Sequence, residues 1–182
     1  MKDESALDTL DEQILWELLR DARTPNNVLA EKLHVSPSTT LTRVRALRER
    51  GVLKSSHAII DLHAVGLHVQ AIVAVRLRAQ ARAQMKTYAA KVMRMPSVLS
   101  AYFIGGADDF MIHVACASTE QLRDFVSINL SMDPAVASTQ TNIVFDYFHG
   151  GHFIDSINGF SDMRAPITDP ASAQGMGERP TR

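Results

Sequence analysis

The chain has 182 residues, of which 46% are hydrophobic and 21% are charged, and its formal net charge at neutral pH is −1. These values are typical of a soluble protein with one large or two small domains, and they exclude a bulk polycation. The single cysteine, Cys116, excludes an intramolecular disulfide framework and a cysteine-based metal site. Since no apolar run approaches 18 residues and the N-terminus does not resemble a signal peptide, we expect a cytoplasmic protein with no membrane partner.

Residues 9–22 contain apolar side chains at helical spacing, which predicts a first helix with one apolar face. Thr9 and Glu12 have the spacing of a capping box, so we expect Thr9 to cap this helix. The only tryptophan, Trp16, lies within it, and we expect its ring to pack at a domain edge.

Residues 24–51 predict two short helices joined by a tight turn. Both Thr24-Pro25 and Ser36-Pro37 combine a hydroxyl cap with a proline at the first helical position, where a missing N–H costs nothing. Gly51 suits the C-terminal cap of the second of these helices, because glycine readily takes a positive φ. The pattern is a helix-turn-helix, in which the second helix enters the major groove of DNA.

The charge of this motif agrees with DNA binding. Residues 32–54 carry six basic side chains against one acidic one, Glu49, which is the footprint of phosphate binding. The alternative is a solvated helix face rich in arginine, a good helix former.

A helical wheel divides the second helix of the motif into two faces. Leu41, Val44 and Leu47 form the face that packs on the other helices, and Arg45 and Arg48 lie nearer this buried side. The side chains of the outer face are short and polar near the helix start, which suits close approach to base edges. This face comprises Ser38, Thr39, Thr42, Ala46 and Arg50, with Arg43 on its flank. Residues 52–61 are expected to leave the motif as an extended segment.

The rest of the chain predicts a βαββαβ order, the ferredoxin-like unit. In this unit the helices cover one face of the sheet. Most of the strands lack a clean alternation of apolar and polar residues, so the other face must also include apolar residues. We therefore expect a partner chain to cover that face. The expected strands are 69–77, 98–106, 109–117 and 136–148, and the expected helices are 81–95 and one opened by a capping box of Ser118 and Gln121.

Beyond about Phe160 the chain is poor in large apolar residues and rich in Pro, Ala, Gly and polar residues. Such a segment buries too little surface to offset its ordering entropy, so we expect a disordered tail.

Three separated motifs resemble the leucine-responsive regulatory protein/AsnC (Lrp/AsnC) family. LDTLDEQILWELLRDART resembles the opening helix of the family, and LAEKLHVSPSTTLTRVRALRERGVL resembles its helix-turn-helix. MPSVLSAYFIGGADDFMIHV resembles the region that holds the family's Gly-Asp-aromatic-Asp loop. The resemblance covers roughly residues 7–150, with the motifs in the family's order.

The resemblance implies an α+β transcriptional regulator without enzymatic activity. It implies a winged helix-turn-helix domain joined to a ferredoxin-like (RAM/ACT-like) domain that binds an amino-acid effector, with double-stranded DNA as partner and no cofactor or metal. It also implies a homo-oligomer, a dimer that can assemble into a tetramer or octamer. The expected divisions are a DNA-binding domain over 1–52, a strand linker over 53–68, an effector-binding and oligomerisation domain over 69–153 and a disordered tail over 154–182.

The family's functional positions carry over as two sets of residues. The DNA-binding set is Ser36, Ser38, Thr39, Thr42, Arg43 and Arg50. The effector-binding set is Gly106, Asp108 and Asp109, with Thr139 and Thr141 on the last strand as weaker candidates. A plain hairpin turn is the alternative for the two aspartates. His34 replaces the family's turn glycine, which predicts a slightly different turn, and Ala107 replaces an aspartate, which predicts a different effector.

Two alternative functions remain open. The first is an enzyme, because the layout of this chain also resembles that of siroheme decarboxylases, which use histidines in place of effector contacts. This chain has seven histidines, and His149 and His152 form their only cluster. That cluster is too sparse for a metal site, which needs three or four converging ligands. The second alternative is an effector-sensing oligomer whose DNA-binding head is vestigial.

Overall fold

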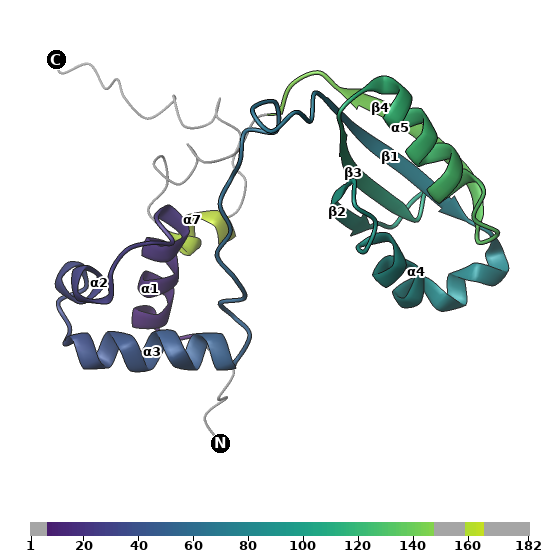
Figure 1. The fold of residues 1–182 in the computed structure, drawn as a ribbon. Coiled ribbons are helices and arrows are strands. Elements are labelled where there is room, and N and C mark those ends of the chain that lie inside the picture. Colours follow the sequence, from purple (N-terminus) through teal and green to yellow (C-terminus); the bar gives the residue numbers. More distant parts are fainter. Residues whose placement is uncertain (1–6, 148–158, 166–182) are drawn as a thin grey trace, which may run out of the picture. The chain divides into compact units, whose positions relative to one another are not determined.

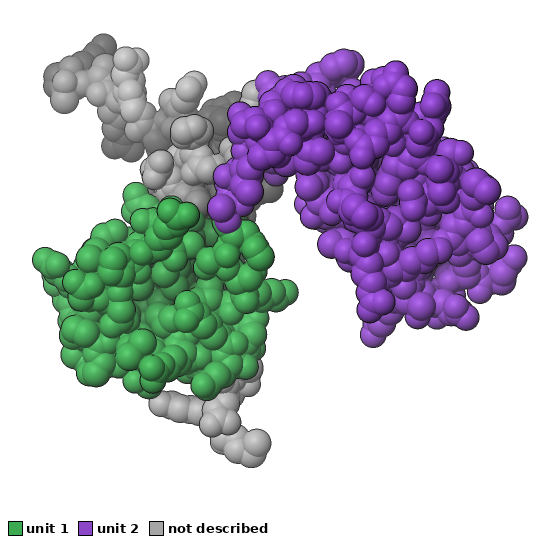
Figure 2. Space-filling view, viewed as in Figure 1, with its two compact units in different colours: residues 1–57, 149–182 green, residues 58–148 purple. Residues whose placement is uncertain are grey.

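The computed structural model describes residues 7–147 and 159–165. The chain divides into two compact units, shown in different colours in Figure 2. The first comprises the described residues up to His57 together with 159–165, and the second comprises 58–147. Within the described residues no helix is long and apolar enough to cross a membrane.

The first unit is a helix-turn-helix built on three helices (Figure 1). Helix α1 spans Thr9–Arg20, α2 spans Asn26–Lys32 and α3 spans Pro37–Glu49. Their shared core is small and centres on Ile14 of α1 with Val44 and Leu47 of α3.

Two of the expected helix caps are displaced in this unit. Asp8, and not Thr9, caps α1, because its Oδ1 accepts the Asp11 backbone N–H at 2.8 Å. The Thr24 hydroxyl donates to the Asp21 carbonyl at 2.8 Å instead of capping α2, which begins after Pro25 without a side-chain cap. The aspartate just before the expected boundary therefore caps α1, whereas the Thr24 hydroxyl is used as a donor in the preceding turn.

The cap and turn that frame α3 follow the sequence prediction. The Ser36 Oγ accepts the Thr39 backbone N–H at 3.1 Å, and Gly51 adopts φ +69° after the helix. His34 adopts φ +54° in the turn before α3, so the turn keeps a left-handed residue although its side chain is not that of glycine. The helix-turn-helix geometry therefore survives the replacement.

The second unit is a four-stranded antiparallel sheet in the order β2-β3-β1-β4, which confirms the βαββαβ prediction. Its elements in chain order are β1 (Val69–Leu77), η1 (Ala79–Gln84), α4 (Met85–Val92), β2 (Val98–Phe103), β3 (Phe110–Cys116), α5 (Thr119–Phe125), η2 (Val126–Ser131) and β4 (Val136–Val144).

The helices cover one face of this sheet. Alternate β1 residues, such as Val73 and Val75, are fully buried beneath Tyr88 of α4 and Phe125 of α5. The opposite face carries the intervening β1 residues and their cross-strand neighbours. Ile72, Ala74, Met111, Ala115 and Tyr102 form its apolar part, among polar residues such as Gln70 and His113. None of the described helices of the second unit packs on this second face.

The segment that joins the two units differs from the expected strand linker. Residues 52–68 contain no strand, and Ile59 and Ile60 within them are 76% and 60% exposed. An extended segment becomes a strand only when a neighbouring strand pairs with its N–H and C=O groups, and no other described segment of the chain pairs with this one.

Helix α7 (Phe160–Arg164) differs from the expected disordered tail. Phe160 packs edge-on against Trp16 of α1, with ring centroids 5.1 Å apart, so the sole tryptophan packs within the first unit. Although the tail is mostly polar, one aromatic residue and a charged partner are enough to order a single turn on an apolar helix face. Residues 154–158 and 166–182 of the expected tail lie outside the described residues.

Candidate DNA-binding surface and effector region

The start of α3 presents a cluster of exposed hydroxyl groups. Ser36 Oγ lies 2.8 Å from both Ser38 Oγ and Thr39 Oγ1, and the Thr42 hydroxyl donates to the Ser38 carbonyl at 2.9 Å. All four side chains are exposed, as the sequence predicted. Short side chains at the start of a helix allow its backbone to come close to a binding partner.

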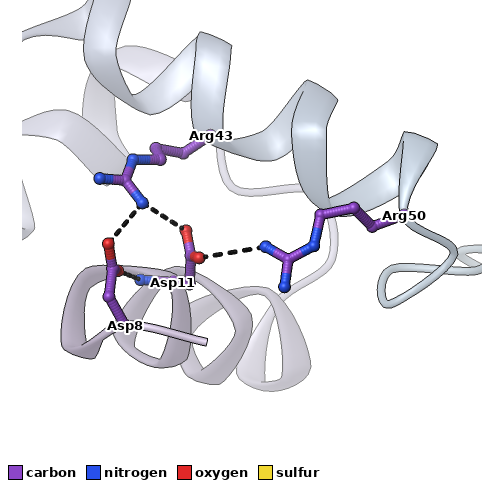
Figure 3. A network of polar contacts seen from close by, with 4 residues as sticks. All are labelled: Asp8, Asp11, Arg43 and Arg50. Carbon is purple, nitrogen blue, oxygen red and sulfur yellow. Dashed lines mark hydrogen bonds and ion pairs between the residues drawn. The ribbon is translucent and has the colours of Figure 1, made fainter. Parts of the chain in front are cut away.

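Arg43 and Arg50 both reach toward α1 (Figure 3), and for Arg50 this orientation differs from the one the helical wheel predicts. Arg43 Nη1 donates to Asp8 Oδ2 and, at 3.2 Å, to Asp11 Oδ1. Arg50 Nη1 lies 3.5 Å from Asp11 Oδ2. Both guanidinium groups therefore face α1, and the prediction that Arg50 points away from the other helices is wrong.

The acidic partners of these arginines sit at the first turn of α1. The Asp11 side chain is only 4% exposed, so its charge depends on the two guanidinium groups for compensation. The backbone N–H of Asp11 and the Arg43 guanidinium hold the pKa of Asp8 below its ordinary value of 3.8, and Asp8 in turn raises the pKa of Arg43. The network joins the recognition helix to α1.

Arg45 and Arg48 are the exposed arginines of α3, and the prediction that they lie near the buried side is wrong. Neither forms an ion pair within the described residues. The buried stripe of α3 instead contains Thr40, Val44 and Leu47, and Leu41 is 41% exposed. The buried stripe is rotated relative to the prediction because the small Thr40 side chain, and not that of Leu41, packs in the core.

The carboxylate of Asp109 is buried and hydrogen-bonded within the second unit. The side chain lies at the end of β3, where the residue is 7% exposed, and its Oδ2 accepts the Leu77 backbone N–H at 2.8 Å. Arg82 Nε lies 3.2 Å from Asp109 Oδ1. The β1–β4 register shifts between Arg76 and Leu77, so this carboxylate satisfies an N–H at the irregularity of the ladder.

The remaining residues of the expected effector set lie at accessible positions. Gly106 is exposed with φ +151°, and Asp108 is half-buried without a described partner. On β4, Thr139 hydrogen-bonds to Ser131 at 3.0 Å, and Thr141 lines a hollow of about 500 Å³ between β4 and the α5–η2 helices.

The sheet register relates the loop to β4. The Asp109 backbone N–H donates to the Val75 carbonyl, and Val75 pairs with Thr139 across β1 and β4. The loop and Thr139 therefore lie at the same end of one sheet, separated by the width of β1.

His113 and Cys116 both lie in partly or fully buried surroundings on β3. His113 Nε2 lies 3.1 Å from Gln70 Oε1, and burial lowers the pKa of the imidazole, as for a satisfied neutral histidine. Burial raises the pKa of the Cys116 thiol, which fits a small buried apolar residue. Residues 7–147 and 159–165 contain no group of His, Cys, Asp and Glu suited to a metal ion, and His149 and His152 lie outside them.

A helix-turn-helix unit followed by an antiparallel sheet with helices on one face is an architecture that suits a two-domain DNA-binding regulator. Two family descriptions match these parts: winged helix-turn-helix DNA-binding over residues 7–54 and the Lrp/AsnC ligand binding domain over residues 70–149. The chain belongs to the Lrp/AsnC family of transcriptional regulators.

Individual relatives agree with this assignment. The HTH-type transcriptional regulator AldR of Mycolicibacterium smegmatis is 44% identical over 144 residues, which cover 79% of this chain and 84% of the relative. The leucine-responsive regulatory protein of Rhizobium meliloti is 33% identical over 74% of this chain and 86% of its own length. Both relatives are named as transcriptional regulators.

Solved structures show the same architecture. The crystal structure of MtbAldR has a TM-score of 0.71 at 40% identity, covering 79% of this chain and 97% of that one. The transcriptional regulator NMB0573 of Neisseria meningitidis, solved as an L-Met complex, has a TM-score of 0.70 at 28% identity, covering 79% and 93% of the two chains.

Proposed function

We propose that the outer face of α3 binds operator DNA in the major groove. Ser38, Thr39 and Thr42 approach the base edges, and Arg45 and Arg48 contact phosphates or guanine edges. The observation that carries the proposal is the exposed, hydroxyl-lined start of α3 beside two exposed arginines without ion-pair partners in the described chain. Arg43 and Arg50 act mainly by holding α3 against α1.

The test measures binding to the DNA upstream of the chain's own gene over a range of salt concentrations. Arg45→Gln and Arg48→Gln are each expected to lower the salt slope by about one unit if the contact is to phosphate, or to cost about 1–3 kcal/mol at one base position if it is to a guanine. Arg23→Gln, at an exposed arginine outside α3, is the matched control. If the wild-type protein does not bind this DNA, the result would favour the alternative function, an effector-sensing oligomer whose DNA-binding head is vestigial.

We infer that the helix-free face of the sheet forms a dimer. Its apolar residues need cover, and a two-fold copy of the same face supplies it. Ile72→Glu places a charge at the centre of this face, opposite His113, and is expected to give a monomer by light scattering with its circular dichroism retained. Gln80→Glu, at an exposed position of η1, is the control. A wild-type monomer at micromolar concentration would refute the proposal.

We propose that a small effector, an amino acid, binds near Gly106 and Asp108, with Thr139 and Thr141 in the same or a neighbouring subunit. The glycine allows a carboxylate to approach backbone N–H groups, and the Asp108 carboxylate can pair with an ammonium group. The L-Met complex of the Neisseria relative supports this class of ligand. Asp109 holds the loop in place and does not bind the ligand directly.

A thermal-shift screen of the twenty amino acids tests the effector. Asp108→Ala and Thr141→Val are expected to abolish the shift produced by the amino acid that binds the wild type. Should both variants respond like the wild type, or no amino acid shift the wild type, the effector lies elsewhere or is of another class.

A further inference from the structure

The second unit carries a dense cluster of positive charge that the proposed function does not use. Between residues 76 and 94 there are six basic residues and no acidic one, which leaves 13 basic and 20 acidic residues elsewhere in the chain. Of the Lys and Arg residues in 58–147, only Arg123 lies outside this segment. The six are Arg76, Arg78, Arg82, Lys86, Lys91 and Arg94.

All six side chains are exposed, and the fold compensates only two of them. Arg82 pairs with Asp109, and Lys91 pairs with Asp133. The other four form no ion pair with any described residue. Three of the six, Lys86, Lys91 and Arg94, lie together on one surface. Like charges on one surface repel each other, so folding alone does not account for this group.

The geometry around α4 suits a long anionic partner. Lys86, Lys91 and Arg94 line one hollow of about 560 Å³, together with the small side chains of Thr87 and Ala90. Lys86 lies in the first turn of α4, and Arg94 follows the last residue of the helix, Val92, by two positions. The two charges therefore lie near opposite ends of α4, on the order of 12 Å apart, which corresponds to about three to four base steps of one DNA strand. The small residues between the charges leave room for a phosphate backbone to lie against the helix.

We propose that the basic surface formed by Lys86, Lys91 and Arg94, on and just after α4, binds the phosphate backbone of duplex DNA that flanks the operator. This inference rests on the proposed DNA binding of α3, which keeps duplex DNA at high effective concentration near the second unit. The contacts are electrostatic and independent of sequence, so they raise affinity for long DNA without altering which operator is recognised.

The experiment compares two duplexes, the shortest that binds the full-length protein and the same operator extended by about two helical turns on each side. The double variant Lys86→Gln/Arg94→Gln is expected to bind the short duplex like the wild type. On the long duplex its slope of log affinity against log salt is expected to fall by about two units. The charge-conserving variant Lys86→Arg/Arg94→Lys is the matched control and is expected to keep the wild-type slope.

Three results would overturn the proposal. The first is an unchanged salt slope of the neutral variant on long DNA, and the second is an equal loss on both duplexes. The third is a change of oligomeric state with unchanged DNA binding, which would make the face a contact for another protein chain. Wild-type protein that binds neither duplex would instead refute the proposed function itself, so the two failures are distinguishable.

Discussion

Arg164 of α7 forms two parallel hydrogen bonds to the carboxylate of Glu12 in α1, Nη1 to Oε1 at 2.9 Å and Nη2 to Oε2 at 3.0 Å. Beside this pair, Phe160 packs edge-on against Trp16. A segment about 150 positions away in the chain therefore packs on the first helix of the DNA-binding unit. Between α7, α1 and residues 52–56 lies an apolar hollow of about 660 Å³, so α7 covers this side of the unit only in part.

Loss of the aromatic contact is expected to release α7 from α1. Phe160→Ala should destabilise the first unit by about 1 kcal/mol and expose the Trp16 indole to water. Because Trp16 is the only tryptophan, a red shift of the intrinsic fluorescence reports this directly. Ser161→Ala, at the exposed neighbouring position, should leave the spectrum unchanged. A wild-type spectrum for Phe160→Ala would show that α7 does not protect Trp16.

The Glu12–Arg164 pair makes the packing of α7 depend on pH. Arg164 lowers the pKa of Glu12 from its ordinary value of 4.5. The contribution of the pair is therefore present above pH 4.5 and is lost as the pH falls through the lowered pKa. We expect the Trp16 fluorescence to shift in this acidic window in the wild type and much less in Arg164→Gln. If the fluorescence of the wild type and of Arg164→Gln changes equally with pH, the change belongs to another titrating group.

Removal of Arg43 is expected to lower the free energy of unfolding more than removal of Arg45. Arg43→Ala deprives the buried Asp11 carboxylate of one partner, at a cost of about 1–3 kcal/mol, which the remaining Arg50 contact reduces. Arg45→Ala, on the exposed side of α3, should change unfolding by less than about 0.5 kcal/mol. Urea denaturation measures both. Equal stability of the two variants would contradict the structural role of Arg43.

Asp109 is expected to stabilise the second unit independently of any ligand. Asp109→Ala leaves the buried Leu77 N–H without its acceptor and should cost about 1–3 kcal/mol, whereas Asp109→Asn keeps an acceptor oxygen and should cost less. Asp108→Ala is the neighbouring control, since Asp108 has no described partner. The comparison uses urea unfolding without amino acids, and a greater loss for Asp108→Ala would reverse the two roles.

The local elements of this fold could be predicted because their causes lie close together in the sequence. Ser36 reaches the backbone of Thr39, Gly51 ends α3 with a positive φ, and the βαββαβ order follows from apolar spacing. The sequence predicts the cap of α1 one residue too late, since Asp8 and Thr9 are both acceptable caps and only the folded chain selects between them.

The predicted sites depended on side-chain directions that local rules do not provide. Arg43 and Arg45 are two residues apart on one helix, yet one faces α1 and the other is exposed. The family resemblance assigns Asp109 to a ligand loop, and in the folded chain its carboxylate accepts an N–H 32 positions earlier. Local rules do not predict these contacts, because electrostatic partners are selected in space and not along the chain.

The sequence by itself determined the helix-turn-helix, the strand and helix order of the second unit and the family, because caps, apolar periodicity and motif order are local properties. Only the tertiary structure decided which arginines of α3 are exposed, that the Asp109 carboxylate is buried against the Leu77 N–H and that α7 packs on Trp16. These outcomes depend on which buried carboxylates and apolar faces meet in the folded chain, and burial makes an unpaired charge or uncovered ring costly.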